Sequence, residues 1–201
     1  MPLLLPGERR FRWLEMLVAI AVVVGLCALG CAAPGAPRRG KSPTLVAAAH
    51  RQARRTAPAA GADENAAFVE RALHDVGFRF GTDGTVRALW GYLRTSHRVV
   101  RAREARPGDV LFFDTRGVAA APECADEAGI IEGVGNDGRI TFVEVRDGRV
   151  RRSFVDPAHP SERRDAQGEI LNSFLRPIRI DDPPGSRYFA GEMLCGVARV
   201  L

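Results

Sequence analysis

Apolar residues along the chain follow two different spacings, and the change comes near residue 105. Before it, apolar residues recur at helical spacing in two segments, from Ala66 to Val76 and from Thr85 to Arg94. After it, short apolar or alternating runs are separated by turns such as Asp147-Gly148, which is the pattern of antiparallel strands. The predicted strands are 110–113, 129–134, 139–145 and 149–154. Helices followed by an antiparallel β-meander predict an α+β fold.

Three further segments carry weaker patterns. Residues from Thr44 to Arg55 are predicted to form a helix with Ser42 as its N-cap, although the apolar stripe of this segment is weak. Residues 170–175 are predicted to form one more short element. The apolar tail, residues 186–201, is predicted to pack back on the domain.

The first thirty residues have the pattern of an export signal. Three arginines lie between positions 9 and 12, and an apolar run without charge follows from Met16 to Ala33. The small residue before Cys31 resembles a bacterial lipoprotein signal, which implies a lipidated Cys31 and, with Ala32 after it, an outer-membrane anchor facing the periplasm. An uncleaved anchor helix and simple cleavage are the alternatives. All three place the remaining chain outside the cytoplasm.

The net charge of +5 is unevenly distributed. After the predicted signal, residues 1–30, the segment 31–62 holds six basic residues and no acidic one, and it is predicted to be a basic tether with a possible first helix. The predicted domain, residues 63–201, has 20 basic and 22 acidic residues. A slightly acidic, exported domain argues against nucleic-acid binding. The basic tether either lies on anionic lipid or polysaccharide, or it is a solvated arm without a partner.

Five pieces of the chain, in this order, resemble the NlpC and CHAP superfamily of papain-like cysteine peptidases and amidases. Asn65–Val69 resembles the start of the catalytic helix. The other four resemble the strands and turn that follow it: Arg106–Phe113, Ala128–Val134, Asn136–Gly138 and Ile140–Glu144. The resemblance implies a papain-like fold, with N-terminal helices packed on the antiparallel meander, and a protein of the bacterial cell wall.

The catalytic residues of that family are replaced in this chain. The family mechanism needs a thiolate at a helix N-terminus, where the helix dipole lowers the thiol pKa, a histidine as base, and a polar group that orients the histidine. By the resemblance, these three positions fall on Asn65, Glu127 and Glu144. An amide cannot be activated as a thiol is, so we expect no catalysis of the family type.

The remaining residues are compatible with other chemistries. Cys124, three residues before Glu127, is a candidate relocated nucleophile, or it forms a disulfide with Cys195 in an oxidising compartment. Glu127 and Glu144 on adjacent strands are a candidate glycosidase pair. The four histidines, residues 50, 74, 97 and 159, show no metal-ligand spacing, and we expect neither a metal nor another cofactor.

The expected function is that of a non-catalytic envelope lipoprotein. The resemblance implies that it binds peptidoglycan peptide or acts as a partner of a cell-wall hydrolase, with membrane attachment through the lipid. Two alternatives stay open. One is an active wall amidase or endopeptidase with an unusual residue set, and the other is a structural envelope protein of a different α+β fold.

Overall fold

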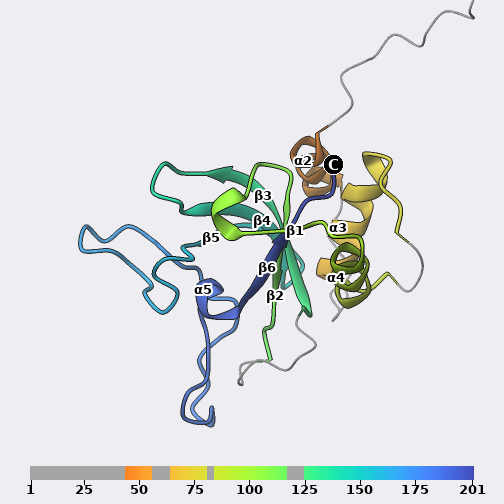
Figure 1. The fold of residues 1–201 in the computed structure, drawn as a ribbon. Helices are drawn as coiled ribbons and strands as arrows, with labels where there is room; N and C mark the ends of the chain where they lie inside the picture. Colours follow the sequence, from red (N-terminus) through yellow and green to blue (C-terminus); the bar gives the residue numbers. More distant parts are fainter. Residues whose placement is uncertain (1–43, 56–63, 81–83, 117–124) are drawn as a thin grey trace, which may run out of the picture. The chain divides into compact units, whose positions relative to one another are not determined.

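The computed structural model describes residues 44–55, 64–80, 84–116 and 125–201 (Figure 1). These residues belong to one compact unit, Pro43–Leu201. Within them, no helix is both long and apolar enough to cross a membrane. The predicted export signal, Cys31 and Cys124 lie outside the described residues, so the interpretations placed on them stay predictions.

Three helices precede the sheet, at Leu45–Arg55 (α2), Glu64–Asp75 (α3) and Val86–Thr95 (α4). Side chains cap the first turns of two of them. The hydroxyl of Thr85 accepts a hydrogen bond from the backbone N–H of Ala88 at 3.1 Å, and the hydroxyl of Thr44 accepts one from Ala47 at 3.2 Å. Thr44 therefore occupies the capping place that the sequence pattern assigned to Ser42.

The helix predicted over Thr44–Arg55 is confirmed as α2, and it packs in the core of the domain. Leu45, Ala48 and Ala49 are each at most 1% exposed, and the helix packs against α3. The apolar stripe is weak only because alanines make up much of it, and small side chains allow two helices to approach closely. The folded unit consequently begins near Pro43, ahead of the predicted boundary at residue 63.

The domain also contains a six-stranded sheet in the order β1-β6-β2-β3-β4-β5, in which every neighbouring pair is antiparallel. Its strands are Val99–Val100 (β1), Val110–Phe113 (β2), Glu127–Val134 (β3), Ile140–Arg146 (β4), Arg149–Val155 (β5) and Leu194–Ala198 (β6). The predicted meander is confirmed as β2 to β5. The α+β class is therefore confirmed.

The C-terminal tail enters the sheet. After a short helix, Ala190–Met193 (α5), strand β6 pairs with both β1 and β2. A short 3₁₀ helix, Ala102–Glu104 (η1), lies between β1 and β2 in the sequence. The prediction that the tail packs back is confirmed, whereas residues 170–175 form no helix or strand and make only isolated bridges, such as Phe174 with Phe189.

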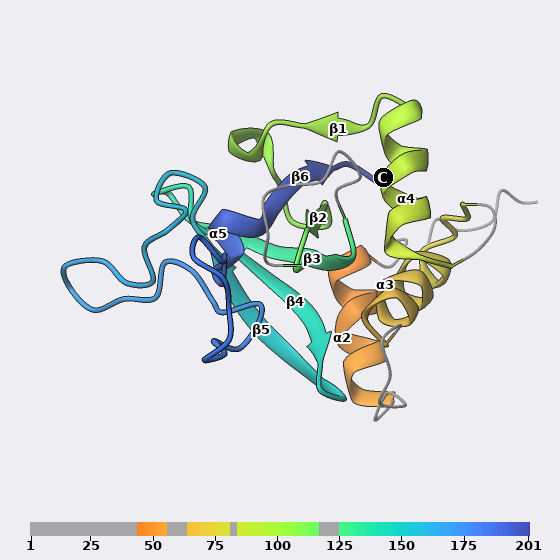
Figure 2. The same ribbon diagram turned by 90° about the horizontal axis from the view of Figure 1, so that it is seen from below.

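Both faces of the sheet are covered. Helices α2, α3 and α4 cover one face, as Figure 2 shows. On this face, Phe112 and Ile130 pack in the same cluster as Trp90. On the other face, Phe113 and Ile131 pack in a second cluster, which also includes Met193 of α5. Because successive side chains of a strand point to opposite faces, a strand between two cores is apolar at every position. This explains the unbroken run Val-Leu-Phe-Phe of β2.

The β4–β5 hairpin is held against the start of α3. Its turn places Asp147 and Gly148 at φ values of 52° and 68°, the left-handed region required by a two-residue hairpin turn. The backbone N–H of Gly148 donates to both carboxylate oxygens of Glu64, at 3.0 and 2.9 Å. The first turn of α3 is therefore fixed at the end of the sheet where β4 terminates.

Packing between β3 and β4 leaves no room for a side chain at Gly129. A Cβ at this position would lie 2.4 Å from Cδ2 of Phe142, which is fully buried. We expect Gly129→Ala to lower the free energy of unfolding by about 1–3 kcal/mol, measured by urea denaturation, because the ring must move. Gly133→Ala is the matched control on the same strand. A Cβ there would have no atom within 4 Å, so its effect should stay within about 0.5 kcal/mol.

Candidate functional site

The site is built around Asn65 and Glu127. Asn65 is the second residue of α3 and Glu127 is the first residue of β3, so the helix start and the strand start meet here. The side-chain amide nitrogen Nδ2 of Asn65 donates a hydrogen bond to Oε2 of Glu127. Asn65 is only 3% exposed, and among the described residues its Oδ1 has no hydrogen-bond partner. The contact therefore joins a buried amide to a partly buried carboxyl group.

Glu144 lies beside this pair on β4 and is 1% exposed. Its Oε1 accepts a hydrogen bond from the hydroxyl of Ser153 at 2.6 Å, and its Oε2 is paired with Nη2 of Arg146 at 2.6 Å. Arg146 also donates from Nη1 to the backbone carbonyl of Phe174. A buried carboxylate is tolerated when its charge is balanced and its oxygens are hydrogen-bonded, and Glu144 has both forms of support.

These surroundings raise the pKa of Glu127 to about 7, against an ordinary value of 4.5. Burial is the largest cause, because it disfavours the charged form. Repulsion from Glu144 acts in the same direction, while the charge of Arg146 opposes it. Glu127 therefore titrates near neutral pH. The group can exchange a proton in the physiological range, which a solvated glutamate does not do.

The structure brings the three positions assigned by the resemblance into one cluster. Asn65 and Glu127 are hydrogen-bonded, and Glu144 is close enough to Glu127 to affect its pKa. The cluster offers an amide, a carboxyl group near its pKa and a neutralised carboxylate. None of these three side chains is a thiol or an imidazole, the nucleophile and the base that a cysteine peptidase uses for acyl transfer, and Cys124 lies outside the described residues.

The cysteine and histidine predictions have different outcomes. Cys195, on β6, is disulfide-bonded, and its partner is outside the described part of the chain, so the pairing with Cys124 stays a prediction. His50 pairs with Glu132 at 2.8 Å. His159 pairs with Asp156 at 2.9 Å, and the hydrogen bond from that carboxylate raises the pKa of His159. His74 and His97 are exposed. Across the described ranges, no three metal-ligating side chains are grouped.

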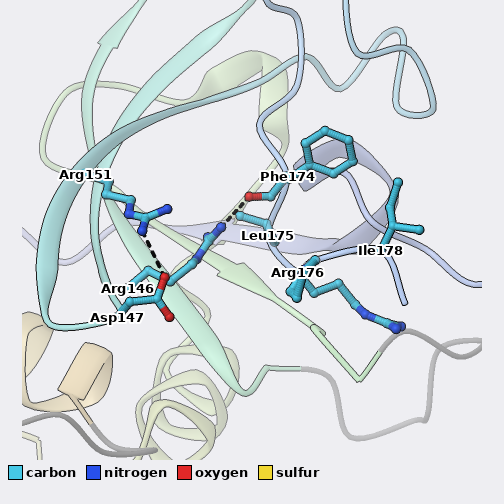
Figure 3. A pocket seen from close by; sticks show the side chains of 8 residues that line it. Arg146, Asp147, Arg151, Phe174, Leu175, Arg176 and Ile178 are labelled. Carbon is cyan, nitrogen blue, oxygen red and sulfur yellow. Dashed lines mark hydrogen bonds and ion pairs between the residues drawn. The ribbon is translucent and has the colours of Figure 1, made fainter. Parts of the chain in front are cut away.

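A pocket of about 430 Å³ adjoins the cluster through Arg146 (Figure 3). The end of the β4–β5 hairpin supplies its charged lining, and residues 174–178 supply a mostly apolar lining. Arg146 was not predicted as a site residue from the sequence. The spacing of Glu144 and Arg146 was an available signal. Residues two apart on a strand lie on the same face, so an acidic and a basic residue at this spacing can form an ion pair.

A scan against protein-family models and a search of the curated proteins each return no match to this chain. The functional conclusion therefore rests on the fold and on the chemistry of the cluster and its pocket.

Proposed function

We propose that this protein is an exported, non-catalytic binding protein of the bacterial cell envelope, built on a papain-like scaffold of the NlpC and CHAP type, and that its ligand is peptidoglycan peptide. The single observation that carries the proposal is the hydrogen bond between Asn65 and Glu127. A helix start facing a strand is the arrangement in which that family places its thiolate and histidine. Here the same arrangement holds an amide and a carboxyl group.

The chemistry of the pair supports binding over hydrolysis. The nitrogen of an amide has its lone pair delocalised, so Asn65 cannot attack a peptide carbonyl as a thiolate does. Glu127, with its pKa near 7, is a competent proton acceptor, but the described side chain hydrogen-bonded to it is the amide of Asn65, which is not a nucleophile. A protonated Glu127 is instead a hydrogen-bond donor suited to a peptide carbonyl or carboxylate, and the buried amide of Asn65 holds it in place.

The pocket beside the cluster supports the choice of a peptide. It combines guanidinium groups with aliphatic and aromatic walls, and wall peptides combine carboxylates with small aliphatic side chains. Concave sites of this mixed character are the usual form of a small-ligand site. Export and lipidation at Cys31 would place such a site in the periplasm, where this ligand is found.

Co-sedimentation with isolated peptidoglycan sacculi tests the proposal. The purified full-length protein should pellet with intact sacculi in a saturable manner. It should not pellet with glycan strands from which the peptides have been removed, because the proposed ligand is the peptide. Equal binding to both preparations, or to neither, would overturn the proposal.

The active-enzyme alternative is favoured by one observation, the raised pKa of Glu127, because a carboxyl group titrating near neutrality is suited to general acid–base catalysis. In that case the full-length protein releases soluble fragments from sacculi, and Glu127→Gln abolishes the release. Product analysis after long incubation separates the two functions, since a binding protein releases nothing.

A further inference from the structure

The pocket beside the cluster carries more positive than negative charge. Three arginines and one aspartate line it: Arg146, Arg151, Arg176 and Asp147. The arginines differ in how firmly each is held. Arg176 is paired with Asp182 and stacks on the ring of Tyr188 at 5.1 Å. It therefore serves mainly to fix the wall of the pocket.

Arg146 provides a fixed positive charge at the inner end of the pocket. Its side chain is 17% exposed, and its guanidinium is held by Glu144 and by the carbonyl of Phe174. Both terminal nitrogens are thus engaged within the protein. Arg146 orients the pocket and links it to the buried cluster, but it is not the group that an incoming ligand would meet first.

Arg151 is the accessible cation. Its side chain is 45% exposed, and its partner Asp147, at 2.9 Å, is 74% exposed. Exposed ion pairs contribute about 0.2–1 kcal/mol, so a ligand carboxylate can replace Asp147 with only a small loss of free energy. A guanidinium has five N–H donors, and the bond to Asp147 uses Nη2 alone. The rest of the group is suited to a second, bidentate carboxylate contact.

The opposite wall is apolar. Leu175 is buried at its base, while Ile178 at the rim is 65% exposed. Phe174 and Pro177 complete this wall. An exposed isoleucine next to an arginine-lined hollow favours a ligand that presents a carboxylate and an aliphatic group close together.

We infer that this pocket binds the C-terminal carboxylate of a short peptide, with Arg151 as the carboxylate-binding residue and residues 174–178 as the seat of the last aliphatic side chain. The inference rests on the proposed function, since it names the part of the peptide that the site takes. A terminal residue with a small aliphatic side chain has the required charge and the required apolar group on adjacent atoms.

Titration calorimetry with two probes tests this inference on the full-length protein. The probes are N-acetyl-alanyl-alanine with a free C-terminus and the same dipeptide as its C-terminal amide. The acid should bind at least tenfold more tightly than the amide. Added salt should weaken the binding of the acid but not that of the amide. Arg151→Gln should weaken binding of the acid about tenfold. Arg149→Gln is the matched control, because Arg149 is an exposed arginine on the same strand that does not line the pocket.

The failure of this inference can be told from failure of the proposed function. Equal affinity for acid and amide, or an unchanged affinity in Arg151→Gln, overturns the carboxylate site even if sacculi are bound. Binding of the free acid without any binding to sacculi supports the pocket and overturns peptidoglycan as the ligand.

Discussion

Replacing Arg146 with methionine is expected to lower the free energy of unfolding by about 3–5 kcal/mol, the usual cost of leaving a buried charge without its partner. Arg146 pairs with Glu144, which is 1% exposed. Methionine keeps much of the aliphatic stem but leaves that carboxylate supported only by the hydroxyl of Ser153. Urea denaturation at pH 8 measures the loss.

Two further variants make the result specific. Arg149→Met removes an exposed arginine that lies opposite Arg146 in the hairpin register, and it should change stability by less than about 0.5 kcal/mol. Adding Glu144→Gln to Arg146→Met removes the stranded charge and should recover much of the loss. If Arg146→Met alone costs less than about 1 kcal/mol, Glu144 does not depend on this ion pair and the description of the cluster is wrong.

Glu127→Gln is expected to stabilise the protein at neutral and alkaline pH. The folded state raises the pKa of Glu127 from 4.5 to about 7, so the folded state holds a proton that the unfolded chain has already released. Stability from this group is complete below pH 4.5 and is lost as the pH rises through 7. The loss amounts to about 3 kcal/mol at 1.36 kcal/mol per pKa unit. Glutamine mimics the protonated form, so the variant should keep that stability at pH 8.

The measurement is the free energy of unfolding as a function of pH for both proteins. The two curves should meet near pH 4.5 and separate by pH 8, with the variant above. Glu132→Gln is the contrasting control on the same strand. Hydrogen bonding from Arg152 lowers the pKa of Glu132, so this variant should be less stable than the parent at neutral pH and should approach it in acid. Parallel curves for Glu127→Gln would show that Glu127 has no raised pKa.

Elements with local signals were predicted closely. Helices α3 and α4 carry apolar residues at helical spacing. The turns at Gly138 and Gly148 separate strands whose apolar residues alternate or form continuous runs. For these elements the local spacing and the tertiary packing favour the same structure. Strand β2 was predicted at its observed bounds, Val110–Phe113.

Elements that depend on distant partners were not predicted. Strand β6 pairs with β1 and β2, which are far from it in the sequence. The local pattern of residues 194–198 does not indicate which strands they pair with. Helix α2 was predicted over nearly its observed range, but its place in the core was not predicted, because its buried face consists largely of alanines, which are weak markers of a core. Within residues 170–175, Leu175 is buried in the cluster on one face of the sheet although the segment forms no strand.

The site was only partly predictable for the same reason. The resemblance assigned Asn65, Glu127 and Glu144 to three related positions, and the structure places these residues in one cluster. The partner of Glu144 and the pocket beyond it were not foreseen. The pocket depends on the packing of residues 174–178, which lack regular structure, against the end of a distant hairpin.

The most direct test of the central claim, that the cluster binds peptide without hydrolysing it, is product analysis of sacculi incubated with the purified full-length protein at pH 7. Released fragments and newly exposed amino groups are measured alongside the fraction of protein that pellets. We expect saturable pelleting with no product above that of a heat-denatured control. Amino groups that accumulate with time and disappear in Glu127→Gln would contradict the account, because they would make the cluster an active site.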